Sequence, residues 1–266
     1  MTATTIAMRR LRVTPARVVT SEWIKFWSLR STITTLGVAL ALLVGIGLMA
    51  SSIMSGGQPG PGGQAGPQSP VDISLTGLNF AQLALGTLGV LFMASEYATG
   101  MIRSSLTAVP KRLPVLWGKI AVFAGVAFVV GLAGAAIAFS GGQAIIGDAG
   151  ASWSDPGVAR AVVGSAVVLA GSGVLGVALG GLLRSTPAAI TTLFGVMFLL
   201  SGVASLLLPA SWADVTQYLP ADAAAAFTAV SPGEGMLAPW GGLAVFVSYI
   251  AVTVIAAAWR LKRTDV

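Results

Sequence analysis

The chain contains no cysteine and no histidine, and only 9% of its 266 residues are charged. The absence of cysteine excludes disulfides and thiol chemistry, and the absence of histidine removes imidazole as a metal ligand and as a general base. A soluble domain carries about 25% charged residues, so too few ions are present here to cover a surface in water. With 55% hydrophobic residues and a mean hydropathy of +0.87, the composition indicates an all-α membrane protein.

Six apolar stretches are long enough to cross the hydrocarbon core, which takes about 20 residues. No acidic or basic residue lies near the middle of any of them. The sequence predicts a cytoplasmic arm at 1–31, a six-span transmembrane domain at 32–260 and a cytoplasmic tail at 261–266. The predicted spans are 33–54, 76–95, 118–140, 158–183, 187–208 and 239–259.

The basic residues are distributed unevenly over the gaps between these spans. Of the 15 lysines and arginines, 14 lie in the arm, the tail and every second gap, and only Arg160 lies in the other gaps. Those other gaps hold six of the nine acids. Because basic loops resist translocation, the pattern predicts that both termini are cytoplasmic. Basic residues facing anionic lipid also account for the net charge of +6, so nucleic-acid binding is not expected.

The arm predicts an amphipathic helix that lies in the membrane interface before the first span. Thr14 and Pro15 form a helix start, in which a side-chain cap precedes a residue that needs no N–H at the first position. Apolar and aromatic residues then recur at three- and four-residue spacing, as in a helix at headgroup depth. They are Val19, Trp23, Phe26 and Trp27. A simple anchor with no mechanical role has the same pattern, and the sequence does not separate the two interpretations.

Two segments on the predicted outer side differ in character. The run 56–70 is rich in glycine and proline and has no apolar face, so we expect a loop without a function there. The gap 209–239 is apolar but too short to span, and we expect re-entrant or interfacial helices in it, before the last span. In the fourth span, Gly176 and Gly180 form a small-xxx-small pair. This pair favours close packing within one bundle over a dimer face.

The gap after the second span carries a motif that matches a known family. Residues 96–112 read Glu-Tyr-Ala-Thr-Gly-Met-Ile-Arg-Ser-Ser-Leu-Thr-Ala-Val-Pro-Lys-Arg. This resembles the Glu-x-x-x-Gly-Thr-hydrophobic-Arg segment, followed by Leu-x-x-x-Pro and basic residues, of ABC-2 type transporter permeases, the membrane subunits of many bacterial ATP-driven exporters. Met101 stands where that family often has threonine. The Ser21 to Lys25 approach to the first span, the six spans with internal ends and the apolar gap before the last span are also similar to that family.

The resemblance implies a short coupling helix in this gap that docks on a separate nucleotide-binding subunit. The contacts it implies are Glu96, Tyr97, Gly100, Met101, Ile102 and Arg103, with Pro110 ending the element. The residue types suit this role, because Gly100 permits close backbone approach while Met101 and Ile102 offer an apolar knob. Arg103 adds an ion-pair donor. A basic loop that only fixes topology would explain Arg103 but would leave Glu96 unexplained.

The energy source is expected to be a partner, because no Gly-x-x-x-x-Gly-Lys-Ser/Thr motif occurs in the chain. The chain itself is therefore not expected to be an enzyme or to hold a cofactor, and ATP and Mg²⁺ are expected on the ATPase. The resemblance implies two ABC-type ATPase subunits and a second permease subunit, the same chain or a paralogue, in a bacterial cytoplasmic membrane. The expected cargo is hydrophobic or amphipathic, such as a drug, peptide or lipid.

Other classes of membrane protein fit the residues less well. An ion-coupled carrier keeps ionisable groups inside its spans, and a six-span serine protease needs a histidine. A membrane scaffold or sensor that docks an ATPase partner without transporting a substrate would have the same spans and the same motif. That alternative stays open at the level of the sequence.

Overall fold

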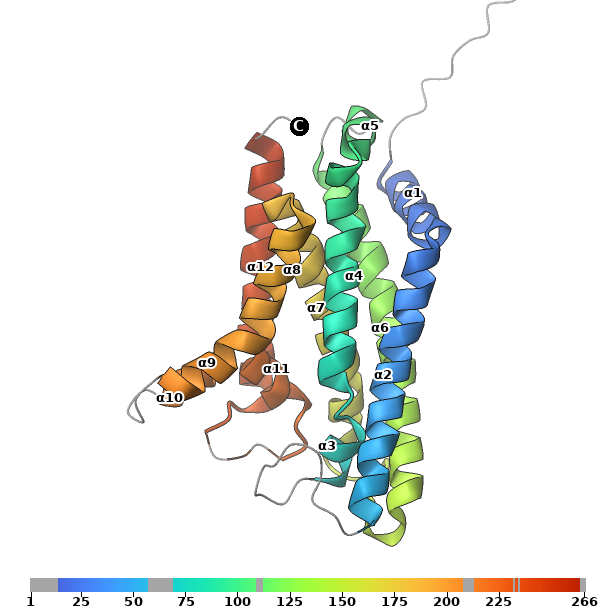
Figure 1. Cartoon of the computed structure of the whole chain (residues 1–266), viewed down its shortest axis with the longest axis vertical. Helices are drawn as coiled ribbons and strands as arrows, with labels where there is room; N and C mark the ends of the chain where they lie inside the picture. Colours follow the sequence, from blue (N-terminus) through green and yellow to red (C-terminus); the bar gives the residue numbers. More distant parts are fainter. Residues whose placement is uncertain are drawn as a thin grey trace, which may run out of the picture.

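The computed structural model describes residues 14–56, 69–108, 112–207, 213–231, 233 and 235–263, and this part of the chain is helical without strands. Six of its helices are long and apolar enough to cross a membrane, which confirms the predicted all-α class and the multi-pass membrane character. Figure 1 shows α1 (Pro15–Ser28), α2 (Arg30–Ser55), α3 (Pro70–Ser74), α4 (Leu78–Ala98), α5 (Met101–Ala108), α6 (Leu113–Ile146), η1 (Gly147–Ala149), α7 (Val158–Leu183), α8 (Thr186–Phe194), η2 (Gly195–Leu199), α9 (Leu200–Leu207), α10 (Ala213–Thr216), α11 (Pro220–Thr228) and α12 (Pro239–Arg263).

The six spans agree with the predicted ones, apart from a longer third span. They run over Arg30–Ser55, Leu78–Ala98, Leu113–Ala149, Val158–Leu183, Thr186–Leu207 and Pro239–Arg263. The third span exceeds the predicted 118–140 at both ends. It starts at Leu113 with a proline in the first turn, where no N–H is needed. At its far end the Gln143 amide donates hydrogen bonds to the carbonyl of Pro70 (3.1 Å) and the hydroxyl of Ser74 (2.8 Å), so a polar turn beyond the apolar run is stabilised.

The two ends of the bundle differ in charge. The helices α1 and α5 and the C-terminal end of α12 lie at one end, which we call the α1 end, and α3 and α11 lie toward the other, the α11 end (Figure 1). Because successive spans run in opposite directions, most described bases gather at the α1 end, while Arg160 in the first turn of α7 lies at the α11 end. The bases at the α1 end are Arg17, Lys25, Arg30, Arg103, Arg112, Lys119, Arg184, Arg260, Lys262 and Arg263.

The central helix of the bundle is α7. Its most apolar stretch is 78% buried inside the protein, against 11% for Thr186–Leu207. It packs on α4 through backbone contacts, because a Cβ at Gly176 would collide with the carbonyl oxygen of Gly86. A Cβ at Gly89 would collide in the same way with Gly173. Gly176 therefore serves close packing within one chain, in agreement with the within-bundle interpretation.

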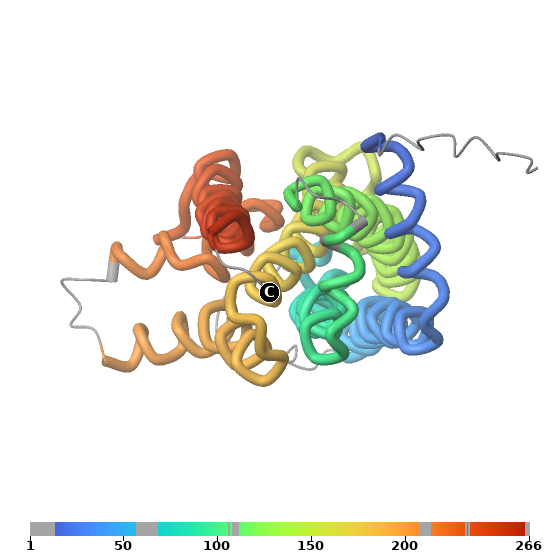
Figure 2. Tube along the Cα trace, turned by 90° about the horizontal axis from the view of Figure 1, so that it is seen from above, coloured from blue at the N-terminus to red at the C-terminus, as the bar shows by residue number. Residues whose placement is uncertain are grey.

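The fifth span is interrupted by the π-helical turn η2, between α8 and α9. A π turn places an extra residue in the helix and bends its axis. Beyond this turn α9 leaves the bundle (Figures 1 and 2), and its last residues, Leu206 and Leu207, are 84% and 76% exposed. Such an apolar surface needs lipid or another protein around it.

The segment before the last span contains the short helices α10 and α11. The helix α11 packs on α7 and α12, with Ala223 and Phe227 buried. Its C-terminal end is held by Arg160 of α7. The guanidinium donates to the carbonyl oxygens of Phe227 (2.6 Å), Ala229 (2.8 Å) and Val230 (3.1 Å). A cation at a helix C-terminus also interacts favourably with the helix dipole, so this one arginine fixes α11 to α7.

The glycine contact between α4 and α7 predicts a position-specific loss of stability. We expect Gly176→Val to lower the free energy of unfolding by about 2 kcal/mol or more, because overpacking costs about 1–3 kcal/mol even where side chains can move aside, and here the neighbour is backbone. Gly125→Val in α6 is the matched control, since no described atom lies within 4 Å of a Cβ there. Denaturation in detergent, followed by tryptophan fluorescence, measures both. Equal losses in the two variants would contradict the α4–α7 contact.

Candidate functional site

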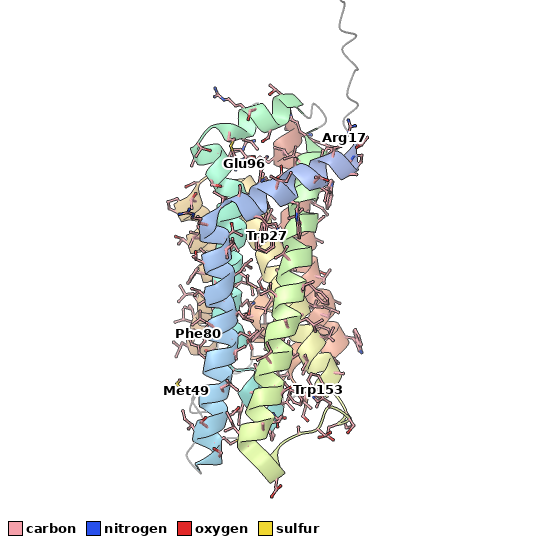
Figure 3. All side chains as sticks on the ribbon, turned by 90° about the vertical axis from the view of Figure 1, so that its right-hand side faces the viewer. Arg17, Trp27, Met49, Phe80, Glu96 and Trp153 are labelled. Atoms are coloured by element: carbon pink, nitrogen blue, oxygen red, sulfur yellow. The ribbon has the colours of Figure 1, made fainter. Side chains whose placement is uncertain are left out.

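A cluster of four charged side chains joins three helices at the α1 end. Glu22 and Lys25 belong to α1, Glu96 to α4 and Lys119 to α6, and we call them the charge cluster. The side chains of Glu22, Glu96 and Lys119 are only 1%, 3% and 1% exposed, whereas that of Lys25 is 30% exposed. Two carboxylates and two ammonium groups sum to zero, so the cluster is neutral as a unit. Figure 3 shows α1 lying across the bundle, with Glu96 behind it and beneath α5.

Lys119 is the centre of the charge cluster. Its ammonium lies 2.8 Å from Glu96 Oε1, to which it donates a hydrogen bond, and 3.3 Å from the carbonyl oxygen of Phe92. It also lies 2.8 Å from Glu22 Oε2, a contact that has ion-pair distance without hydrogen-bond alignment. The Phe92 ring centre is 4.1 Å away, a cation–π geometry. Two carboxylates from different helices thus depend on one lysine.

Lys25 connects the charge cluster to α5. Its ammonium donates to Glu22 Oε1 (2.8 Å), Glu96 Oε1 (3.1 Å) and the Ser105 hydroxyl (3.1 Å). That hydroxyl in turn donates to Glu96 Oε2 (3.4 Å). Burial lowers the pKa of Lys25, but the hydrogen bond and charge of Glu22, together with those of Glu96, outweigh burial and raise the pKa above its ordinary 10.5. The lysine is therefore charged at neutral pH.

Aromatic packing beside the charge cluster holds α1 in the same place. The Phe26 ring of α1 meets Phe92 of α4 at 5.2 Å between ring centres and Phe123 of α6 at 5.9 Å, both edge to face. Gly118 lets α1 approach α6, because a Cβ there would lie 3.1 Å from Cγ1 of Val18. Charge pairing and ring packing therefore fix α1 against α4 and α6 together.

Three of the predicted coupling residues lie inside the protein rather than on its surface. Glu96 is 3% exposed and belongs to the charge cluster, and Ile102 is 1% exposed and packs in the apolar core. Tyr97 is half-buried, with the guanidinium of Arg184 5.3 Å from its ring centre. The contacts of these side chains hold α5 and the end of α4 on the bundle.

The other predicted coupling residues face outward where they are described. Gly100 is exposed and has a φ of +71°, the left-handed backbone that glycine favours. Met101 is 47% exposed, and Arg103, two residues further along α5, is also exposed. Pro110 lies outside the described residues. The structure therefore leaves Met101 and Arg103 as the side chains of this set that a partner can reach.

Three of the four side chains predicted for an interfacial face of α1 are exposed, and the fourth, Phe26, is buried. The helix begins at Pro15 and Thr14 caps it, as predicted. Val19, Trp23 and Trp27 are 38%, 48% and 39% exposed. Phe26 does not share this face, because it is 1% exposed and lies one turn after Glu22 on the face that meets the bundle. Spacing alone grouped it with the tryptophans, because Phe26 follows Trp23 by three residues and Glu22 by four, and so lies at the border between the two faces of the helix.

Sequence reasoning missed the charge cluster as a whole. The positive-inside rule already accounts for Lys25 and Lys119 as bases that flank spans, and this hides their pairing. The available signal is in the acids, because Glu22 and Glu96 are the described acids at an end that is otherwise basic. An isolated acid among bases near a membrane indicates a specific partner.

The charge cluster is held together by ion pairs and hydrogen bonds. Its carboxylates and ammonium groups neutralise one another, and among the described residues no group of three or more metal-ligating side chains comes together. A comparison with protein-family models finds no match for the chain, and a comparison with curated proteins finds none either. The functional proposal therefore rests on the geometry of the charge cluster and of α5.

The charge cluster predicts a non-additive pattern of stabilities. We expect Lys119→Met to lower the free energy of unfolding by about 3–5 kcal/mol, because it leaves two buried carboxylates with too little compensation. Adding Glu96→Gln restores neutrality, so the double variant should recover most of that loss. Lys262→Met, at an exposed base of the same end, should change stability by less than about 0.5 kcal/mol. The measurement is again denaturation in detergent, and a double variant at least as unstable as Lys119→Met would count against a neutral unit.

Proposed function

We propose that the protein is the permease subunit of an ATP-binding-cassette exporter of the ABC-2 type, driven by a separate ATPase subunit. The position of α5 carries the proposal. Its outer face presents Met101 and Arg103, and its inner face is tied to the charge cluster through Ser105. A partner that binds the outer face of α5 and displaces this helix would therefore also displace α1, α4 and α6, because short polar contacts connect them.

The mechanical role follows from the energetics of buried ion pairs. Separating Lys119 from its carboxylates would leave uncompensated charges out of water, which is strongly unfavourable. The helices α1 and α5 and the adjoining ends of α4 and α6 are therefore expected to move as one body. The spans free to shift against this body are those with little burial, Thr186–Leu207 at 11% and Pro239–Arg263 at 22%. We infer that binding of ATP by the partner changes the angle between these two groups of helices.

We place the α1 end in the cytoplasm of a bacterial cell membrane. The described bases gather at this end, and basic flanks are retained on the cytoplasmic side. The exposed Trp23 and Trp27 of α1 then lie at the headgroup level of the inner leaflet, where tryptophan is enriched. At the opposite side, α11 is a re-entrant helix of the outer leaflet, held by Arg160.

The assembly we propose contains two permease subunits and two ATPase subunits, with ATP and Mg²⁺ bound by the ATPase. The second permease subunit, a copy of this chain or a paralogue, would cover part of the apolar surface that α9 exposes at Leu206 and Leu207. The pathway between two such apolar halves suits a hydrophobic or amphipathic cargo. A scaffold that docks an ATPase without transport is the alternative, and transport into vesicles separates the two.

The outer face of α5 provides the test. The protein is co-expressed with candidate ABC-type ATPases from the same genome and reconstituted into vesicles. The measurements are binding of the ATPase, ATP turnover and transport of lipophilic dyes. We expect Met101→Asp with Arg103→Glu to reduce coupled ATP turnover at least about tenfold, because an apolar contact and an ion pair are both reversed. Folding should be unaffected, since surface substitutions change stability by about 0.5 kcal/mol or less.

Lys262→Glu is the control for this test, because it reverses one exposed charge at the same end but outside α5. Unchanged ATPase binding and turnover in the α5 variant would refute the coupling assignment. Intact binding and turnover in the unmodified protein, without movement of any dye, would favour the scaffold instead.

A further inference from the structure

We propose that Arg184, Tyr97 and Arg260 form a binding site for the phosphate group of an anionic phospholipid, at the α1 end between α4, α7 and α12. This site adjoins the charge cluster, because Tyr97 follows Glu96 in the chain, but it shares no residue with it. Its occupancy does not depend on an ATPase or on transport, so it can be tested independently of the function proposed above.

The backbone at Arg184 is unusual for an arginine. The residue closes α7, where its N–H donates to the carbonyl of Gly180 at 3.0 Å, and it has a φ of +56°. Helices that end in this left-handed conformation usually have glycine there, because a Cβ is disfavoured. Strained conformations of this kind concentrate at functional sites. Backbone conformation alone would favour glycine at position 184, so the arginine there indicates a role for its side chain.

The side chain of Arg184 has donors without acceptors. Its Nε and Nη2 atoms are buried and have no hydrogen-bond partner among the residues that the structure describes. The guanidinium lies 5.3 Å from the ring centre of Tyr97, and the Tyr97 hydroxyl is close to it but makes no aligned hydrogen bond to any described residue. Buried polar groups in native proteins are nearly always paired. Three polar atoms therefore converge where a partner is expected.

The charge at this place is also unbalanced. Arg260 donates to the carbonyl oxygen of Leu182, two residues before Arg184, and lies close enough to Tyr97 for its charge to act on the phenol. The described acids at this end, Glu22 and Glu96, already pair with the lysines of the charge cluster. Two arginines and a phenol without a described counter-ion are a match for a phosphate, because the guanidinium fork binds such oxygens in a bidentate manner.

The depth of the site selects a lipid as the source of the phosphate. Arg184 lies directly between the ends of two apolar spans, at the level where lipid headgroups lie. In Figure 1 the start of α8 lies lower than the ends of α5 and α12, so the site is set back from the outermost part of the α1 end. The first turn of α8 also has no side-chain cap, and its free N–H groups add to the attraction for an anion.

The test compares the protein in nanodiscs of phosphatidylcholine with the protein in nanodiscs that contain increasing fractions of phosphatidylglycerol. The readouts are thermal stabilisation of the protein and retention of lipid in native mass spectrometry. We expect saturable stabilisation by phosphatidylglycerol. In Arg184→Gly the half-saturating fraction should rise about fivefold, as expected for the loss of one basic side chain at a membrane surface. Stability in pure phosphatidylcholine should be equal or higher, because glycine suits the backbone at this position.

Arg184→Lys and Arg263→Gln are the matched variants. The lysine keeps the charge but loses the fork, so its half-saturating fraction should lie between those of the unmodified protein and Arg184→Gly. Arg263→Gln removes one exposed charge from the same end and should leave the saturation curve unchanged. Equal weakening by Arg263→Gln and Arg184→Gly would overturn the site in favour of general surface charge. Equal stabilisation by millimolar inorganic phosphate in phosphatidylcholine would overturn the assignment to lipid.

Discussion

The burial of Glu22, Glu96 and Lys119 in one place constrains the rest of the α1 end. Burying any one of these charged groups alone would cost a large desolvation free energy. The opposite charges offset this cost only when all three groups are buried together. Glu22 also pairs with Lys25 on α1, but because the three groups come from α1, α4 and α6, these helices must meet in one register before all of the charges are compensated. The charge cluster thus fixes the direction in which α1 crosses the bundle, which aromatic packing around Phe26 alone would specify less sharply.

A second constraint acts deeper in the bundle and has a different physical basis. The glycine contacts of α4 with α7 bring two backbones together without side chains between them, so these helices have little freedom to slide or separate. In the described residues that follow α7, the one such contact joins Gly242 of α12 to the backbone of Ala223 in α11, and η2 interrupts the first span after α7. Motion in this protein is therefore more easily accommodated by α8, α9 and α12 than by α4, α6 and α7. A rigid body beside a loosely covered pair of spans is the arrangement that a conformational cycle requires.

The sequence predicts what depends on neighbouring residues and misses what depends on distant ones. Apolar length located all six spans, and Thr14 with Pro15 located the start of α1, because capping and span length are local properties. The burial of Glu96 depends instead on Lys119, 23 positions away, and on Lys25, 71 positions away. The inward face of Phe26 likewise depends on where α1 lies relative to α4 and α6. No composition or periodicity argument contains that information.

Four cations of the described part of the chain fall into two groups with different partners. Lys25 and Lys119 pair with carboxylates and add no net charge to the α1 end. Arg160 and Arg260 donate to backbone carbonyls at helix ends, which stabilises those ends, and the Asp72 carboxylate lies close enough to Arg160 to interact with its charge. These two arginines therefore join helices through backbone carbonyls, whereas the two lysines join them through carboxylates. Because the two sets are separate, the contacts that hold α1 and α5 to the bundle do not have to change when the lipid around the protein does.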